Sequence, residues 1–258
     1  EEGGTVVRAS SNPNLFPSRE PSPQVLYAQG GLDAILQDAR QKSVTLLDLG
    51  VNVNFAPVAD VSTDPADFIY ERALGQDAQT TADYVAQVVT AMGQERIGSV
   101  LKHFPGYGNN QDTHTGVAVD ERPYETFETS DFLPFQAGIQ AGADAVLVSH
   151  NIVTSMDESL PASLSPAVHQ ILRDTLGFDG VILTDDLAMD AVAQYAQDGS
   201  AAVLAVQAGN DMVLTTDFET QIPQVIAAVE DGTIPMEQID QSVARVLSWK
   251  YDLGLLGY

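Results

Sequence analysis

Residues 98–114 read Gly98-Ser-Val-Leu-Lys-His-Phe-Pro-Gly-Tyr-Gly-Asn-Asn-Gln-Asp-Thr-His114, and they join an apolar run to a loop rich in titratable side chains. The run 98–101 is short, and Lys102 and His103 follow it at once. Pro105 and the glycines after it then end regular structure, because proline fixes φ and glycine permits positive φ. The stretch therefore predicts a buried strand over 98–102 that ends in reactive groups.

The same rhythm of strand and helix runs through the whole chain. Continuously apolar segments predict strands over 51–58, 98–102, 145–148, 180–183 and 211–214. Apolar residues at helical spacing predict helices over 31–49, 78–95, 131–141, 166–177, 189–208, 218–231 and 235–252, after a loop over 9–23. Strands that are apolar throughout and alternate with helices indicate a parallel sheet covered by helices.

The expected fold class is α/β, as a (β/α)8 barrel of the TIM type or, alternatively, an open doubly wound sheet. A closed barrel needs about three strands more than the sequence predicts. The chain opens with Glu-Glu-Gly-Gly, without a start methionine or a signal peptide. We therefore expect the gene product to extend further, with the missing strands upstream of residue 1, and we treat 1–258 as a single, N-terminally incomplete domain.

Composition narrows the classes of partner. The chain has 36 acidic and 11 basic residues and a formal net charge of -25 at pH 7. A polyanionic surface repels nucleic acid and anionic lipid, so neither is an expected partner. No apolar run approaches the roughly 18 residues of a membrane span, and the absence of cysteine excludes disulfides and cysteine-ligated zinc. The compartment stays open, although such acidity favours a secreted or cell-surface protein over a cytoplasmic one.

Polar side chains gather where the predicted strands end. They are Asp60, Lys102, His103, His150 and the pair Asp185–Asp186. In parallel α/β folds the C-terminal ends of the strands carry the active site. These residues are therefore the first candidates for a functional site.

Two adjacent carboxylates follow the strand predicted over 180–183. Adjacent acids repel each other, so the arrangement costs stability unless one of them is hydrogen-bonded or functional. Asp185 is interpreted as a nucleophile or base aimed into a pocket. Asp186 fits the simpler role of a helix N-cap, which accepts free backbone N–H groups.

Asp112 and His114 are spaced to act together on the loop after residue 110. In an extended segment, positions i and i+2 face the same side. A carboxylate there can orient an imidazole and stabilise its charge, as a general acid/base requires. The alternative is a polar surface loop with an incidental histidine.

Each of the other candidates has a structural alternative. Lys102 and His103 donate hydrogen bonds to hydroxyls, or they are a salt-bridged lysine and a capped histidine. Asp60 accepts two vicinal sugar hydroxyls, or it forms a turn. Arg72 binds substrate or pairs with nearby acids, and His150 binds ligand or satisfies backbone groups.

A metal or nucleotide site has little support. Asp112, His114, His150 and Asp185 could in principle gather around zinc, but the chain has neither His-x-His nor His-Glu-x-x-His. Gly-x-Gly-x-x-Gly and the phosphate loop Gly-Lys-Ser/Thr are also absent.

Five segments, taken in order, resemble glycoside hydrolase family 3, in its β-N-acetylglucosaminidase branch of the NagZ type. They are Glu2-Gly-Gly-Thr-Val-Val-Arg8, Phe55-Ala-Pro-Val-Ala-Asp60, Lys102-His-Phe-Pro-Gly106, Asp112-Thr-His114 and Thr184-Asp-Asp-Leu-Ala-Met189. The resemblance covers essentially the whole chain.

The resemblance implies a (β/α)8 barrel and a retaining hydrolysis of β-linked N-acetylglucosamine. It makes Asp185 the nucleophile that forms a glycosyl-enzyme intermediate, and His114, oriented by Asp112, the acid/base. The residues that it places on the sugar are Asp60, Arg72, Lys102, His103, His150 and Met189. It implies a carbohydrate substrate and no metal or organic cofactor.

The chain departs from the family pattern after Gly106, where Gly106-Tyr-Gly-Asn-Asn110 replaces the common Gly-His-Gly-Asp-Thr in a loop one residue shorter. This departure leaves open the placement of His114 and the preference for N-acetyl sugars. The alternatives are a β-glucosidase of the same family, a metal-dependent barrel hydrolase and a non-catalytic sugar-binding protein. The aglycone, whether a peptidoglycan fragment, a chitin oligomer or a plain glucoside, and the choice between hydrolysis and phosphorolysis are not determined.

Overall fold

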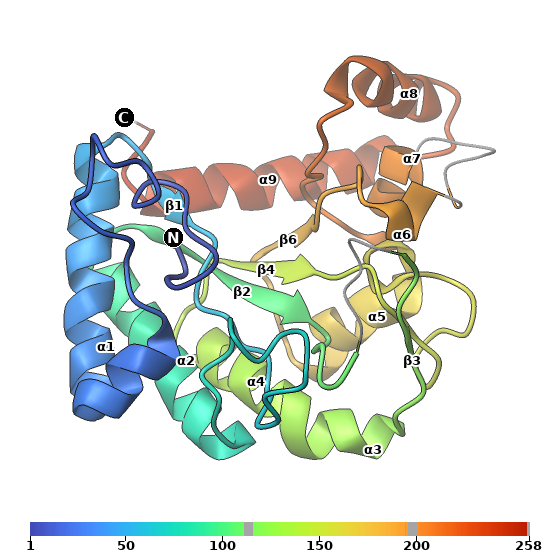
Figure 1. The fold of residues 1–258 in the computed structure, drawn as a ribbon. Helices are drawn as coiled ribbons and strands as arrows, with labels where there is room; N and C mark the ends of the chain where they lie inside the picture. The colour runs from blue at the N-terminus through green and yellow to red at the C-terminus, as the bar shows by residue number, and fades with distance from the viewer. Residues whose placement is uncertain (111–115, 194, 196–200, 257–258) are drawn as a thin grey trace. The chain divides into compact units, whose positions relative to one another are not determined.

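The computed structural model describes residues 1–110, 116–193, 195 and 201–256. The chain divides into two compact units. The first unit comprises residues 1–109 and 126–144, and the second comprises residues 110–125 and 145–258. Figure 1 traces the chain.

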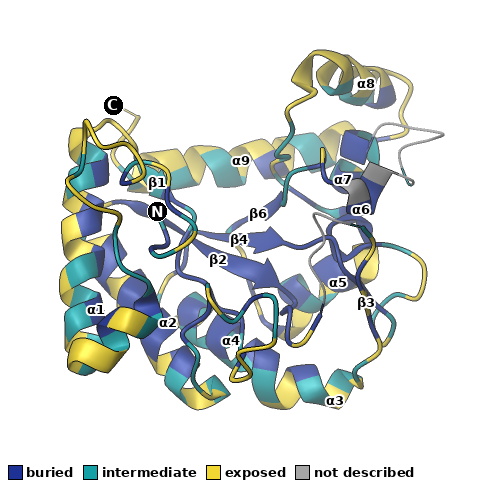
Figure 2. Cartoon of the chain, in the orientation of Figure 1, coloured by how far each residue is buried: buried dark blue, intermediate teal, exposed yellow. Residues whose placement is uncertain are grey.

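The first unit is built on a parallel pair of strands. β1 (Val53–Asn54) pairs with β2 (Gly98–Phe104). An isolated parallel bridge between Val58 and Lys102 continues the pairing toward the C-terminal ends. β2 is buried along its whole length, as its dark blue ribbon in Figure 2 shows. Polar groups at its end are therefore held by a rigid, dry element.

Three helices cover this pair. α1 (Pro23–Asp48), α2 (Ala78–Glu95) and α4 (Phe132–Gln140) pack so that α2 contacts both of the others. α1 and α2 have an exposed yellow side in Figure 2, as expected of helices with one apolar face, whereas α4 is mostly buried or intermediate. A short α3 (Tyr124–Thr126) and a π-helical turn (Phe127–Asp131) lead into α4.

Aromatic packing ties β2 to α4. The ring of Phe104 stacks on Phe132 at a centroid distance of 5.7 Å and meets Phe135 edge-on at 5.2 Å. All three rings are buried. Because buried rings contribute large apolar areas with defined geometry, this contact fixes the end of β2, where Lys102 and His103 lie.

The second unit has two parallel pairs of its own. β4 (Ala145–Val148) pairs with β6 (Val181–Thr184), and Val148 is aligned with Thr184. β3 (Val119–Asp120) pairs with β5 (Ile152–Val153). The C-terminal ends of β4 and β6 therefore lie side by side.

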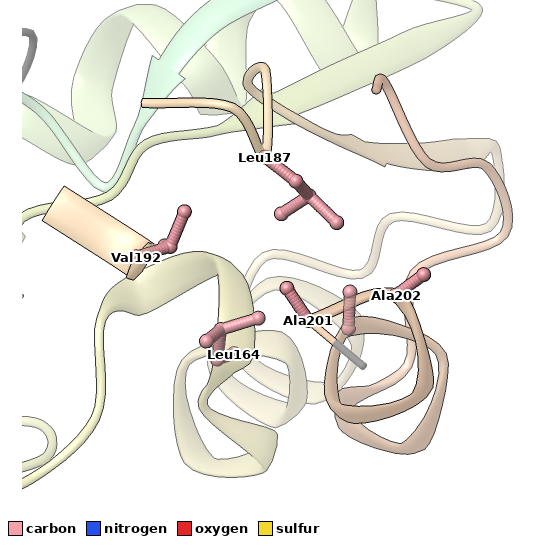
Figure 3. Packing of buried hydrophobic residues seen from close by; sticks show 6 residues of the cluster. Leu164, Leu187, Val192, Ala201 and Ala202 are labelled. Atoms are coloured by element: carbon pink, nitrogen blue, oxygen red, sulfur yellow. The ribbon is translucent and has the colours of Figure 1, made fainter. Parts of the chain in front are cut away.

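Helical segments pack around these strands. A 3-10 turn (Ala162–Leu164) precedes α5 (Pro166–Gln170), and a π-helical turn (Ile171–Thr175) follows it. The later helices are α6 (Asp190–Ala193), α7 (Ala201–Ala208), α8 (Phe218–Glu230) and α9 (Met236–Asp252). Figure 3 shows an apolar cluster formed by the 3-10 turn, the segment after β6, α6 and α7. Its members are Leu164, Leu187, Val192, Ala201, Ala202 and Ala205. The cluster supports the segment that follows β6.

Most predicted elements are confirmed. The helix over 78–95 and the strand over 145–148 have the predicted bounds, and the pairs β1–β2, β3–β5 and β4–β6 are all parallel. The α/β class is therefore confirmed. Closure into a barrel and a single domain over 1–258 stay predictions.

Three predicted strand bounds are wrong, and one helical segment was not predicted. The strand predicted over 98–102 extends to Phe104. The helix predicted over 31–49 is confirmed after the kink at Gly30 and Gly31, and a helical segment that begins at Pro23 precedes that kink. The strand over 51–58 is regular only at β1, and that over 211–214 is a single parallel bridge from Met212 to Leu183. Apolar composition determined neither burial nor the length of the hydrogen-bonded ladder here, since Val51 and Met212 are exposed. Among the described helices, none combines the length and apolarity needed to span a membrane.

We expect Gly138→Ala to destabilise the first unit. A Cβ at Gly138, in α4, would lie 2.7 Å from Cδ1 of Leu101 and 2.9 Å from Cγ1 of Val85. Overpacking of this kind costs about 1–3 kcal/mol, which exceeds the gain of up to about 1 kcal/mol from alanine's helix propensity.

Gly93→Ala is the matched control for this prediction. Gly93 is an exposed glycine of α2, and a Cβ there would meet no atom within 4 Å. Urea titration should show a lower free energy of unfolding for Gly138→Ala and an unchanged or higher one for Gly93→Ala. Equal behaviour of the two variants would contradict the packing argument.

Candidate active site

The first unit gathers four predicted substrate-binding residues into one hydrogen-bonded cluster. Asp60 and His103 follow or end adjacent parallel strands, Lys102 precedes His103 on β2, and Arg72 approaches from the segment before α2. The expectation that these side chains lie together is therefore met. Lys102 and His103 both reach the cluster, as the sequence interpretation requires.

Both carboxylate oxygens of Asp60 form hydrogen bonds within the first unit. Its Oδ2 accepts hydrogen bonds from the backbone N–H of His103 at 3.0 Å and lies 2.8 Å from Nδ1 of the same ring. Its Oδ1 accepts from the N–H of Tyr107 at 2.8 Å. The Tyr107 ring in turn packs edge-on against His103, with centroids 5.2 Å apart. Asp60 therefore orients His103 and anchors the loop that follows β2.

The contacts of His103 assign its tautomer. Nη2 of Arg72 lies 3.1 Å from its Nε2. A guanidinium can only donate, so Nε2 must be the unprotonated acceptor, and Nδ1 must carry the proton that is donated to Asp60. His103 is therefore neutral in this arrangement.

Glu2 is the residue that sequence reasoning missed. Its carboxylate accepts from Nη2 of Arg72 at 2.7 Å and from Nε at 3.0 Å, and it forms an ion pair with Nζ of Lys102. The sequence places it only within the family-like segment 2–8, without a role. The sequence did contain one signal for such a residue. The chain has only three lysines, and Lys102 follows the apolar run 98–101 of a buried strand, where a lysine needs a carboxylate partner.

The electrostatics of Glu2 follow from these partners. Burial raises the pKa of the Glu2 carboxyl, but the charge of Lys102 and the hydrogen bond and charge of Arg72 outweigh burial. The pKa is therefore lowered from 4.5 to about 2. Glu2 is thus a permanently charged, buried anion at neutral pH.

The second unit places Asp185 directly after β6. Its backbone N–H donates to the Val148 carbonyl at 3.0 Å, and its Oδ1 accepts from the N–H of Asp186 at 2.8 Å. Oδ1 of Asp186 accepts from the N–H of Ala188 at 2.9 Å. Asp186 therefore stabilises a local turn, close to the structural role expected of it, although it does not cap a helix.

His150 holds this turn in place. Its Nε2 lies 3.0 Å from the carbonyl oxygen of Asp186, and its Nδ1 lies 2.7 Å from Oγ of Ser163. A carbonyl only accepts, so Nε2 carries a proton. The ring is fully buried, which favours the backbone-satisfying alternative for His150. Met189, also buried, closes the same turn through its N–H to the Asp186 carbonyl.

Asp112 and His114 lie outside the described residues. The chain on both sides of them is anchored. Nδ2 of Asn110 donates to Oδ2 of Asp120 at 2.9 Å, and Nη2 of Arg122 pairs with the same oxygen at 2.7 Å. Asp120 therefore links Asn110, which precedes residues 111–115, to the chain that follows them.

Asp112 and His114, two of the four residues considered for zinc, lie outside the described residues. Within the described ranges, no group of three or more histidine, aspartate or glutamate side chains is arranged to hold a metal ion. The carboxylates and imidazoles described above are instead paired with cations, hydroxyls and backbone N–H groups.

We expect the stabilising contribution of Glu2 to be lost in acid. A carboxyl with a lowered pKa in the folded state stabilises the fold above its unfolded pKa, and it loses this contribution as pH falls toward the folded pKa. The window runs from 4.5 to about 2. Over this window, wild type should lose roughly 3 kcal/mol more free energy of unfolding than Glu2→Gln. Urea titrations at several pH values measure this difference, and parallel pH dependences of the two proteins would refute it.

Comparison with known proteins extends these observations. The sequence profile described as "Glycosyl hydrolase family 3 N terminal domain" matches residues 1–249. Beta-hexosaminidase LpqI of Mycobacterium tuberculosis is 31% identical over 261 residues, which cover 97% of this chain and 66% of that protein. A beta-hexosaminidase of Xanthomonas campestris pv. campestris is 32% identical over 263 residues, covering 100% of this chain and 74% of that protein. The chain thus spans about two thirds to three quarters of the length of these relatives.

Solved structures agree with the sequence comparison. A family 3 beta-N-acetylglucosaminidase from Paenibacillus sp. matches with a TM-score of 0.86 at 32% identity, over 92% of this chain and 47% of that chain. A family 3 glycosyl hydrolase from Mycobacterium smegmatis matches with a TM-score of 0.88 at 31% identity, over 100% of this chain and 78% of that chain. The parallel α/β fold is therefore consistent with the N-terminal barrel domain of these enzymes. With the profile and the relatives in agreement over nearly its whole length, the chain belongs to glycosyl hydrolase family 3.

Proposed function

We propose that the protein is a retaining glycoside hydrolase that releases terminal β-linked N-acetylglucosamine. The observation that carries the proposal is the position of Asp185, a half-buried carboxylate placed directly after a buried parallel strand and held by backbone hydrogen bonds. Active sites of parallel α/β folds lie at this end of the strands. The names of the relatives, beta-hexosaminidase and beta-N-acetylglucosaminidase, supply the sugar class.

In the proposed first step, a carboxylate oxygen of Asp185 attacks the anomeric carbon while the bond to the leaving oxygen breaks. His114 donates its proton to that oxygen, so the aglycone leaves as a neutral alcohol. In the second step, the neutral imidazole takes a proton from water, which attacks the glycosyl ester and frees Asp185. Two inversions give net retention, and Asp112 orients the ring throughout.

The cluster of the first unit is proposed to hold the sugar. Lys102 and Arg72 carry only donors, so they suit the lone pairs of hydroxyl and carbonyl oxygens. Asp60 and His103 are proposed to act with them by fixing the geometry, since Asp60 already binds His103 and the following loop. His150 and Met189 are proposed to contribute by holding the turn that carries Asp185.

Replacement of the nucleophile is the main test. Asp185→Asn should lower kcat for p-nitrophenyl β-N-acetylglucosaminide by several orders of magnitude, on the order of 10⁴, because an amide cannot form the glycosyl ester. Asp186→Asn is the matched control, since it changes the adjacent acid, whose role is a local turn. Comparable activity of Asp185→Asn and wild type would refute the mechanism.

The same assay separates the alternative functions. Turnover of the β-glucoside alone would still support Asp185 as the nucleophile, but it would make the protein a β-glucosidase. Loss of activity with a chelator would favour a metal-dependent hydrolase, whereas we expect no effect. Sugar binding without turnover of either substrate would favour a binding protein.

The acid/base role of His114 predicts a dependence on the leaving group. His114→Gln should reduce kcat/KM strongly for a substrate with a poor leaving group, such as N,N'-diacetylchitobiose. The reduction should be at least about tenfold smaller for the 2,4-dinitrophenyl glycoside, whose leaving group departs without protonation. Steady-state kinetics of wild type and variant on both substrates measure this ratio. Equal losses on both would refute the assignment of His114 as the acid.

A further inference from the structure

The carboxylate of Glu2 joins two cations that approach from different segments. Its Oε1 accepts from Nη2 of Arg72 at 2.7 Å and contacts Nζ of Lys102, and its Oε2 accepts from Nε of Arg72 at 3.0 Å. The Glu2 side chain is 2% exposed, that of Lys102 8% and that of Arg72 14%. Bidentate, charge-assisted bonds of this kind are strong and directional. They fix both cations before any ligand arrives.

The local backbone fixes Glu2 at this point. Nζ of Lys42, from α1, donates to the backbone carbonyl of Glu2 at 3.2 Å and is itself paired with Asp38. The next residue, Gly3, has φ +110, and a Cβ on it would lie 2.1 Å from the carbonyl oxygen of Pro21. Only glycine allows this close approach. The backbone is therefore shaped so that the Glu2 side chain points inward.

Glu2 supplies negative charge directly to two cations. Arg72 and Lys102 are positive, and Glu2 and Asp60 are negative. His103 is neutral because its Nε2 accepts from Arg72. Removing Glu2 would make the cluster more positive by one charge, beside a lysine and an arginine, and such a pair is typical of binding sites for sulfate, phosphate or carboxylate.

We infer that Glu2 is a positioning and specificity residue, which orients Lys102 and Arg72 toward uncharged sugar oxygens and prevents the pair from binding anions. The inference rests on the proposed function in that it assigns the cluster to the sugar. It restricts that sugar to an uncharged one, and it makes uronic acids and sulfated or phosphorylated sugars poor ligands at this position.

Binding of sulfate alone tests the inference independently of catalysis. Isothermal titration calorimetry at constant ionic strength should show no sulfate binding to wild type in the low millimolar range. Glu2→Gln should bind sulfate at least about tenfold more tightly, since one charge-assisted interaction is worth this much. Glu2→Asp, which keeps the charge, should resemble wild type. Asp38→Asn is the matched control, because it removes a nearby negative charge that is paired with Lys42.

Steady-state kinetics test whether Glu2 positions Lys102 and Arg72 for the sugar. On p-nitrophenyl β-N-acetylglucosaminide, Glu2→Gln should raise KM about tenfold or more and become competitively inhibited by sulfate, while Glu2→Asp should recover part of the KM. A merely structural role would lower the folded fraction without creating sulfate inhibition.

Several results would overturn the inference. These are equal sulfate affinity in wild type and Glu2→Gln, tight sulfate binding by Glu2→Asp or Asp38→Asn, or competitive inhibition of wild type by sulfate. Inhibition of wild type by sulfate can be measured without a variant, so this test applies even if Glu2→Gln fails to fold. A protein that cleaves no hexosaminide but shows the expected sulfate pattern would refute the proposed function and leave the charge assignment intact.

Discussion

Pairing of buried charge is the constraint on which the rest of this site depends. A lysine, an arginine and two carboxylates lie almost out of contact with water, and a charge left unpaired in such a place would cost several kcal/mol. Glu2 forms ion pairs with both Lys102 and Arg72, and the Asp60 carboxylate contacts Nδ1 of His103. Because each group has its partner within the first unit, the arrangement is formed before substrate binds.

Parallel strands explain why these residues can meet. Neighbouring parallel strands end at the same edge, so the residues after β1 and at the end of β2 are brought together in the first unit, and those after β4 and β6 in the second. The apolar strands supply rigidity, and the polar groups begin where the strands end. In each unit an imidazole links two strand ends, and its hydrogen-bond partners set its tautomer. His103 contacts Asp60 in the first unit, and His150 contacts Asp186 in the second.

Much of the fold was predictable because it depends on local pattern. The helix over 78–95 has a regular apolar face and an aspartate cap at Asp77, whose Oδ1 accepts from the Thr80 N–H at 2.8 Å. The helical segment that begins at Pro23 was not predicted, because non-helical Gly30 and Gly31 separate it from the regular helix that follows. The segment 211–214 is apolar and adjacent to β6, yet only Met212 pairs, since pairing depends on the partner strand rather than on composition.

The sequence by itself determined the α/β class, the order of the elements and the residue types of the candidate site, because periodicity, chain breakers and short motifs are local properties. Only the tertiary structure decided which charges face each other. Glu2 meets Arg72 across 70 positions of sequence, and the proton of His103 is placed by groups from two other segments. Such contacts depend on strand register and on the packing of distant segments, and no local pattern encodes them.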